Sequence, residues 1–153
     1  MNHFKGAVLM LLALLMISGC SGSKTLVLRD ADSHNIIATW PLTEGEPFSI
    51  EFTHSVNKSP VIDEFTIEGD RIRAVKTTYS SLGAGVQTEL GPGETLDYDE
   101  SGRMVISGFQ QTFESLNLIV GTVSDHILTI QGKTISLTEL CGRNAAVTFA
   151  VHE

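Results

Sequence analysis

The sequence predicts an all-β fold, either an antiparallel β-sandwich or a small barrel of about ten short strands. From Leu26 onward, short runs of β-branched and aromatic residues are separated by clusters of Gly, Pro, Asn and Asp, which is the pattern of strands and turns. Helical periodicity is scarce, and no helix of crossover length separates the runs, so a parallel α/β plan is not indicated. The spacing of the strands is compatible with both a sandwich and a barrel, and the two stay open at this point.

The expected strands fall into two groups on either side of a long loop. The first group is 25–29, 36–40, 48–54, 61–68 and 71–79, and the second is 104–106, 115–121, 126–131, 133–137 and 146–152. Turn residues at 30–35, at Gly69-Asp70 and at Gly132 separate sequence neighbours, which should therefore pair as antiparallel hairpins. The glycine-rich stretch 83–93 divides the groups, and a short helix is expected near 137–141.

The N-terminal segment predicts an export signal. Lys5 precedes an uncharged apolar run from Gly6 to Ile17, which is about a dozen residues, whereas a spanning helix needs roughly 20. Ile17-Ser18-Gly19-Cys20 resembles the lipobox of bacterial lipoproteins, which implies cleavage before Cys20 and lipidation of its thiol. An uncleaved membrane anchor and an ordinary signal peptide are the less favoured alternatives.

This interpretation divides the chain into a signal peptide at 1–19, a lipidated tether at 20–24 and a single β domain at 25–153. The domain would lie on the extracytoplasmic side of the cell envelope, held at the outer membrane or at the outer leaflet of the cytoplasmic membrane by the lipid on Cys20. Cys141 would then be the only other thiol, so no intramolecular disulfide could form.

The charge balance argues against nucleic acid as a partner. Nine Lys and Arg and all 18 Asp and Glu follow the expected signal, which gives that part of the chain a formal charge of −9. Such a surface repels phosphate backbones and acidic lipid headgroups. Attachment to a membrane should therefore come from the lipid and not from a basic patch.

A histidine and an aspartate occupy positions where the strand pattern would place apolar side chains. His54 continues the apolar stripe of residues 48, 50 and 52, and Asp63 interrupts the set formed by residues 61, 65 and 67. If the two strands form a hairpin around residues 55–60, both side chains lie on one face near its loop. A buried carboxylate needs a partner, and an imidazole could provide it.

Two interpretations of this pair stay open. The pair could simply hold the hairpin closed, or it could form a site for a ligand or partner together with Ser55, Lys58 and Ser59. Catalysis is not indicated, because adjacent strand residues face opposite sides and the Gly-x-Ser-x-Gly elbow is absent. The histidines lack metal-ligand spacing, so the sequence predicts neither a metal nor a cofactor.

The loop motif Gly83-Ala84-Gly85 could offer backbone amides to an anion. It lacks the Gly-Lys-Ser/Thr sequence and the strand-to-helix context of phosphate-binding loops, so a turn that needs positive φ is the favoured interpretation.

A resemblance adds to these inferences. Residues 52–61, which read FTHSVNKSPV, together with Asp63 and the SLGAG segment at 81–85, resemble the bacterial domain-of-unknown-function family 1850. The match is good over roughly residues 48–86. The resemblance implies a small exported protein whose His-Ser-Val segment, Ser-Pro-Val step, acidic residue and Gly-Ala-Gly loop form one site. The family pattern more often has Glu where this chain has Asp63.

The resemblance also implies an association with TRAP-type transporters of the TAXI class. The sequence therefore predicts a lipid-anchored extracytoplasmic binding or accessory protein that engages a small solute or the subunits of such a transporter. The alternative is a structural envelope lipoprotein without a small-molecule ligand. A hydrolase is a distant third and would require a nucleophile within hydrogen-bond reach of His54.

Overall fold

Somewhat more than half of the described residues lie in strands. The computed structural model describes residues 23–56, 58–80, 87 and 89–152. Its elements are β1 (Lys24–Asp30), β2 (Ile36–Leu42), β3 (Phe48–Thr53), β4 (Pro60–Glu68), β5 (Arg71–Tyr79), β6 (Thr95–Tyr98), β7 (Met104–Ser107), β8 (Thr112–Phe113), β9 (Ser115–Ile119), β10 (Ile127–Ile130), β11 (Lys133–Ser136), α1 (Leu137–Cys141) and β12 (Ala146–His152).

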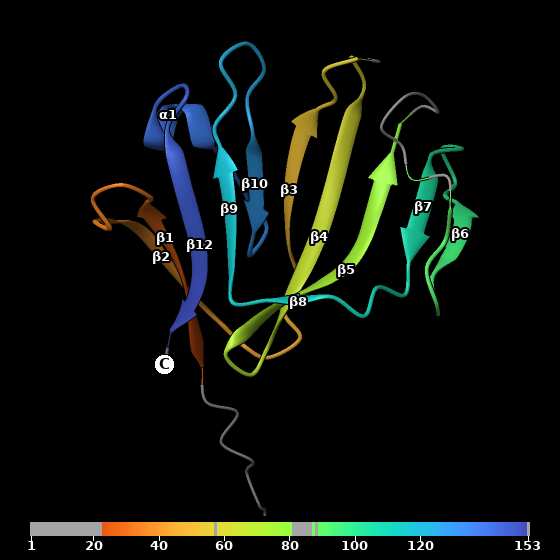
Figure 1. Cartoon of the computed structure of the whole chain (residues 1–153), viewed down its shortest axis with the longest axis horizontal. Coiled ribbons are helices and arrows are strands. Elements are labelled where there is room, and N and C mark those ends of the chain that lie inside the picture. The colour runs from red at the N-terminus through yellow and green to blue at the C-terminus, as the bar shows by residue number, and fades with distance from the viewer. Residues whose placement is uncertain (1–22, 57, 81–86, 88, 153) are drawn as a thin grey trace, which may run out of the picture.

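The strands form two antiparallel sheets of unequal width (Figure 1). The four-stranded sheet has the order β2-β1-β12-β9, and the eight-stranded sheet has the order β11-β10-β3-β4-β5-β7-β6, with β8 paired to β5. The predicted all-β class is confirmed, and of the two architectures that the sequence left open the structure is the sandwich. In the described part of the chain, no helix is long and apolar enough to cross a membrane.

The ten strands expected from the sequence are all present, and so is the short helix. Two strands were not predicted. All four residues of β6 are exposed, so it has no apolar alternation to detect, and β8 is only two residues long. The first residue of β1, Lys24, is also the last residue of the expected tether. The expected loop 83–93 lies partly outside the described residues.

The core lies between the sheets and is built by alternation along the strands. In β12 the side chains of Val147, Phe149 and Val151 face inward, and their neighbours face outward. Phe149 is fully buried, and its ring centroid lies 6.5 Å from that of Phe48 on the facing sheet. Phe48 in turn stacks on Phe65 at 5.5 Å. These contacts join the two sheets through aromatic packing.

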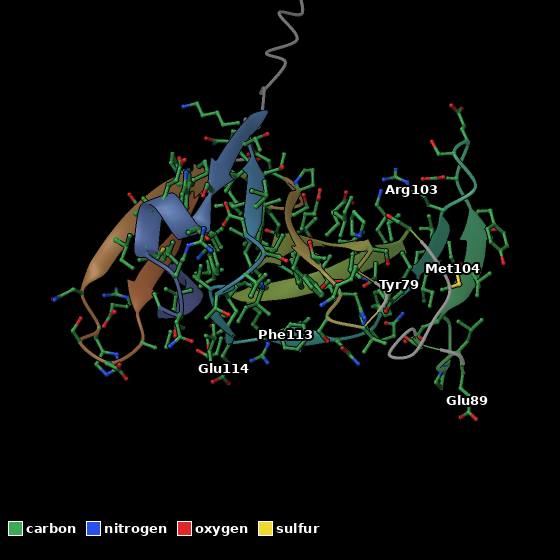
Figure 2. All side chains as sticks on the ribbon, turned by 90° about the horizontal axis from the view of Figure 1, so that it is seen from above. Tyr79, Glu89, Arg103, Met104, Phe113 and Glu114 are labelled. Carbon is green, nitrogen blue, oxygen red and sulfur yellow. The ribbon has the colours of Figure 1, made fainter. Side chains whose placement is uncertain are left out.

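The unequal width of the sheets leaves part of the inner face of the larger one to be covered by other means. We call residues 108–114 the strap. It runs between β7 and β9 and includes β8 (Figure 1), and Figure 2 shows Phe113 and Glu114 on it, along one side of the large sheet. Phe109 of the strap packs with Met104 and Ile106 of β7 in a second, smaller apolar cluster. The strap therefore covers the inner face beyond the reach of the small sheet.

The start of the strap depends on a close approach of two backbones. Gly108 has a φ of +85°, and a Cβ added to it would lie 2.3 Å from the carbonyl oxygen of Gly93. We expect Gly108→Ala to lower the free energy of unfolding by more than about 1–2 kcal/mol, the cost of left-handed backbone alone for a residue with a Cβ. Urea denaturation measures the change.

Gly102 provides the matched control, because its φ of +74° imposes the same conformation but nothing lies within 4 Å of the added Cβ. Gly102→Ala should therefore be the milder of the two substitutions. Equal losses in the two variants would show that the contact with Gly93 does not constrain the strap.

Candidate functional site

Asp63 is the carboxylate on the inner face of the large sheet, in the middle of β4. It lies opposite Ile50 of β3 and opposite Thr77 of β5, on the face that also carries Phe65 and Ile67. Thr77 Oγ1 donates a hydrogen bond of 2.7 Å to Asp63 Oδ1. Burial raises the pKa of Asp63, and the hydrogen bond from Thr77 opposes part of that effect. The fold thus holds a half-buried acid among apolar neighbours.

Two adjoining cavities meet at this carboxylate. One has a volume of about 430 Å³ and the other about 240 Å³, and both are lined by Asp63, Phe65 and Leu116. We call the two cavities together the Asp63 pocket. Its size falls in the range of small-molecule sites, which are apolar clefts with a few polar groups that orient the ligand.

The larger cavity lies between the strap and strands β4 and β5. The strap contributes Phe109, Gln111 and Phe113, and the opposite wall includes Ala74 and Thr77. Gln87 and Glu94 also line this cavity. Glu94 Oε2 accepts hydrogen bonds from the side-chain amide of Gln87 and, at 2.8 Å, from the backbone N–H of Gly91.

The smaller cavity lies against β3, β4 and β9 and contains a histidine. His126 directly precedes β10, and its ring stacks on Phe52 with a centroid distance of 5.8 Å. Its Nδ1 accepts a hydrogen bond of 3.0 Å from the backbone N–H of Gly121, which assigns the hydrogen of the neutral ring to Nε2. Burial lowers the pKa of His126, and the charge of Asp125 opposes this. A neutral imidazole and a carboxylate therefore line the same cavity.

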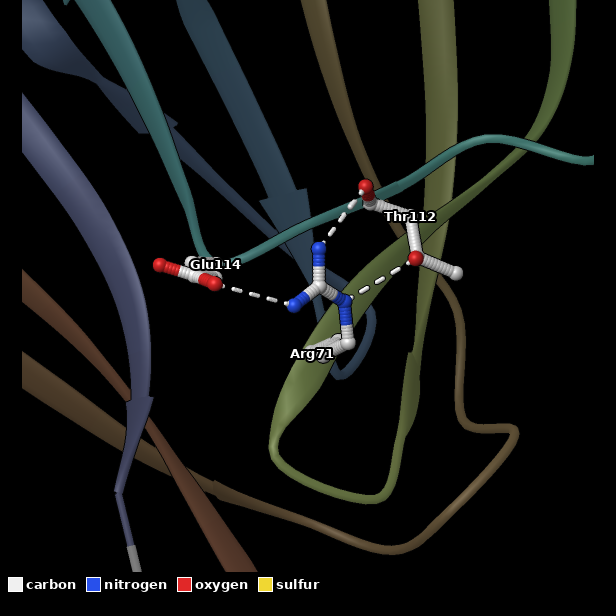
Figure 3. A network of polar contacts seen from close by, with 3 residues as sticks. All are labelled: Arg71, Thr112 and Glu114. Atoms are coloured by element: carbon white, nitrogen blue, oxygen red, sulfur yellow. Dashed lines mark hydrogen bonds and ion pairs between the residues drawn. The ribbon is translucent and has the colours of Figure 1, made fainter.

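The strap that walls the larger cavity is held by Arg71 at the start of β5 (Figure 3). Arg71 Nε donates to Thr112 Oγ1 at 2.9 Å, and Nη2 donates to the backbone carbonyl of Thr112 at 3.3 Å. Nη1 reaches Glu114 Oε1 at 3.2 Å. One guanidinium thus makes contacts with both the backbone and the side chains of the strap.

We expect Arg71→Ala to lower the free energy of unfolding by about 1–2 kcal/mol, because a charged donor to two acceptors is lost. Glu114→Ala should change it by no more than about 0.5 kcal/mol, since the Glu114 side chain is 87% exposed and water screens its ion pair. Urea denaturation of the two variants measures both values. A larger loss from Glu114→Ala than from Arg71→Ala would contradict this assignment of the strap contacts.

The structure does not bring His54 to Asp63. The predicted hairpin forms, but its register pairs Thr53 with Pro60 and Ile50 with Asp63, so Asp63 lies well inside the strand and not near the loop. His54 is four residues from Ile50, about 13 Å along an extended chain. Its Nδ1 instead accepts a hydrogen bond of 3.3 Å from the backbone N–H of Val56.

The other predicted site residues that the structure describes belong to the turn between β3 and β4. The backbone N–H of His54 donates to the carbonyl of Ser59 at 2.9 Å, and that of Lys58 donates to the carbonyl of His54 at 3.0 Å. Ser55 and Lys58 are exposed, and the φ of Lys58 is +55°. These contacts favour a turn-forming role for His54. Cys20, Gly83, Ala84 and Gly85 lie outside the described residues, so their predicted roles stay predictions.

Several residues of the pocket were not predicted as site residues. His126, Thr77 and Leu116 come from three different strands or their ends, and only the sheet order brings them to Asp63. The available signal was the break in apolar alternation at Asp63 itself. Among the described residues, no group of three or more His, Cys, Asp or Glu side chains could hold a metal ion.

The fold and the pocket define a small antiparallel β-sandwich with a carboxylate-centred cavity on the inner face of its larger sheet. The chain belongs to the domain of unknown function family DUF1850, whose model matches residues 48–137. This confirms the family expected from the sequence motifs. The matched region runs from the first residue of β3 to the first residue of α1, so it contains Asp63, the strap and His126. No curated protein and no solved structure matches the chain.

Proposed function

We propose that this chain is a lipid-anchored extracytoplasmic binding protein that takes a small molecule in the Asp63 pocket. The observation that carries the proposal is the position of Asp63 at the junction of two cavities, on an inner face where it lies beside Phe65 and Leu116 and is hydrogen-bonded by Thr77. Small-molecule sites combine an apolar lining with a few polar groups that fix the orientation of the ligand.

The energetics of the carboxylate support binding over a purely structural role. Burial raises the pKa of Asp63, so its ionised form is less stable in the folded chain than in water. An apolar side chain would suit the packing of this inner face better, and functional sites are where such a cost is commonly retained. A structural carboxylate would be expected in a closed network, whereas this one borders open cavities.

The chemistry of the lining supports binding over hydrolysis. The described residues around the two cavities include no serine or cysteine that could act as a nucleophile beside His126. We therefore propose a binding or accessory role and no catalytic one.

The anchor and the partner are proposed from the sequence. The lipobox-like segment ending at Cys20 supports attachment through a lipid, and β1 begins four residues later at Lys24. The membrane would then lie near the end of the sandwich at which β1 starts (Figure 1). The transporter association implied by the family resemblance supports a role in solute uptake beside a TRAP-type transporter of the TAXI class.

Thermal unfolding with a panel of small solutes tests the binding role. The panel contains amino acids, dicarboxylates, amines and neutral alcohols, and it is applied to the full chain in detergent and to its Asp63→Asn and His54→Ala variants. A ligand at 100 times its Kd stabilises the native state by about 2.7 kcal/mol, which appears as a rise in melting temperature.

We expect at least one solute to raise the melting temperature of the parent and of His54→Ala but not that of Asp63→Asn. If the shift is lost in His54→Ala and kept in Asp63→Asn, the site lies in the β3–β4 turn and not in the pocket. If no solute shifts the parent, the proposal of a small-molecule receptor is wrong.

Membrane fractionation tests the anchor. Cys20→Ser should move the protein from the membrane fraction to the soluble extracytoplasmic fraction or leave it unprocessed at its original mass, because no thiol remains to carry the lipid. Cys141→Ser is the matched control and should stay in the membrane fraction, since Cys141 is a half-buried thiol packed against the core. Labelling of Cys20→Ser by a radioactive fatty acid would refute the assignment.

A further inference from the structure

Negatively charged side chains outnumber positively charged ones in the lining of the Asp63 pocket. Among the described lining residues of the larger cavity, Asp63, Glu64 and Glu94 are carboxylates. The one Lys or Arg in that lining is Lys76, whose Nζ lies 3.4 Å from Glu64 Oε2. Glu64 and Lys76 lie opposite each other in the β4–β5 ladder, so this lysine is already paired with a carboxylate. No cationic side chain of the described lining is therefore available to neutralise Asp63.

The smaller cavity contributes no positive charge either. Among the residues that line the smaller cavity, His126 is the one titratable group besides Asp63. Burial lowers the pKa of His126 and so favours its neutral form. The Nε2 hydrogen assigned above makes the ring a neutral donor. The whole chain has a formal charge of −8, which repels anions and attracts cations at long range.

Half of the apolar residues that line the pocket are phenylalanines. Phe65, Phe109 and Phe113 line the larger cavity together with Asp63, and Phe52 lines the smaller one. The face of a phenyl ring carries negative electrostatic potential and attracts organic cations within about 6 Å of its centroid. The same rings can cover a hydrocarbon body by ordinary apolar contact. The carboxylate and the phenyl rings together therefore favour a ligand that has a positive charge and a hydrocarbon body.

We propose that the Asp63 pocket selects organic cations, in which an ammonium group pairs with the carboxylate of Asp63 and an apolar body lies against the phenylalanine rings. This inference rests on the proposed binding function and names its ligand class. A carboxylate or phosphate ligand would meet Asp63 and Glu94 with like charge, and a neutral ligand would leave Asp63 without a counter-charge.

Calorimetric titration with three molecules of similar shape tests the selection. n-Butylammonium, n-butanol and n-butyrate share one apolar body and differ in the charge of the head group. Each is titrated into the full chain at neutral pH and low salt, and into the Asp63→Asn and Glu68→Gln variants. The two substitutions remove the same charge from the same strand, but Glu68 is exposed at the end of β4 and lines neither cavity.

We expect n-butylammonium to bind at least tenfold more tightly than n-butanol or n-butyrate. Asp63→Asn should weaken its binding at least tenfold, while Glu68→Gln should change it less than twofold. Added NaCl should weaken the binding in the parent, because the attraction is electrostatic.

Equal or tighter binding of n-butanol or n-butyrate would overturn the selection for cations and leave the small-molecule function standing. If none of the three binds, the cation inference fails, and the wider solute panel decides separately whether the pocket binds anything. Equal losses in Asp63→Asn and Glu68→Gln would show a general effect of surface charge and would overturn the placement of the ammonium group at Asp63.

Discussion

Phe149→Ala will lower the free energy of unfolding by about 3–5 kcal/mol, the usual cost of removing a large aromatic side chain from a core. Phe149 is fully buried, and its ring lies 6.4 Å from that of Trp40 and 6.5 Å from that of Phe48. It therefore joins the small sheet to the large one. Removal of its ring would leave a cavity at the contact that holds the sandwich together.

Urea denaturation at neutral pH measures this loss, and two variants serve as controls. Phe149→Leu keeps most of the apolar volume and should cost less than about 1.5 kcal/mol if the neighbours repack. Tyr98→Ala changes an aromatic residue that is 63% exposed on β6 and should alter stability by no more than about 0.5 kcal/mol. A loss of similar size in Phe149→Ala and Tyr98→Ala would contradict the assigned core.

Asp63→Asn will weaken ligand binding at least tenfold and at the same time stabilise the unliganded protein at neutral pH. The pKa of Asp63 is raised by burial in the folded state, so the stability linked to its protonated form is fully present below the unfolded pKa and is lost as pH rises through the folded pKa. Asn has no ionised form to desolvate. Its amide oxygen can still accept the hydrogen bond from Thr77.

Urea denaturation across the pH range separates these effects. The advantage of Asp63→Asn should be absent well below the ordinary Asp pKa of 3.8 and should grow as pH rises through the raised pKa of Asp63. The neighbouring titratable groups are present in both proteins and are Glu64, Lys76, Tyr79, Glu94 and His126. A variant that is less stable than the parent at neutral pH would contradict the assignment of Asp63 as a destabilising carboxylate.

The fold could be predicted from the sequence to the extent that burial leaves an alternating pattern. Strand β12 buries every second residue, and in β4 Asp63 is the one break in that alternation, so the sequence predicts both strands and their approximate bounds. The edge strand β6 buries none of its residues and carries no such signal. The choice of a sandwich over a barrel depends on which strands pair, and that information is not local.

The site could be predicted only in part for a related reason. Asp63 was found because it interrupts an apolar face, which is a property of one strand. The prediction that His54 lies beside Asp63 was wrong. In the β3–β4 hairpin Thr53 pairs with Pro60, and this register places Asp63 well inside the strand, away from the turn that contains His54. His126 reaches the pocket because β10 pairs with β3 across a long sequence separation. No pattern in the sequence alone predicts that pairing.

Chemical-shift mapping tests the central claim, binding at the Asp63 pocket, most directly. ¹⁵N-labelled full chain in detergent is titrated with the panel solute that gives the largest thermal shift, and amide resonances are followed residue by residue. The account predicts that the largest changes fall at Phe65, Thr77, Leu116 and His126, with the turn residues Ser55 and Val56 unaffected. Changes confined to the β3–β4 turn, with the pocket residues unmoved, would contradict it.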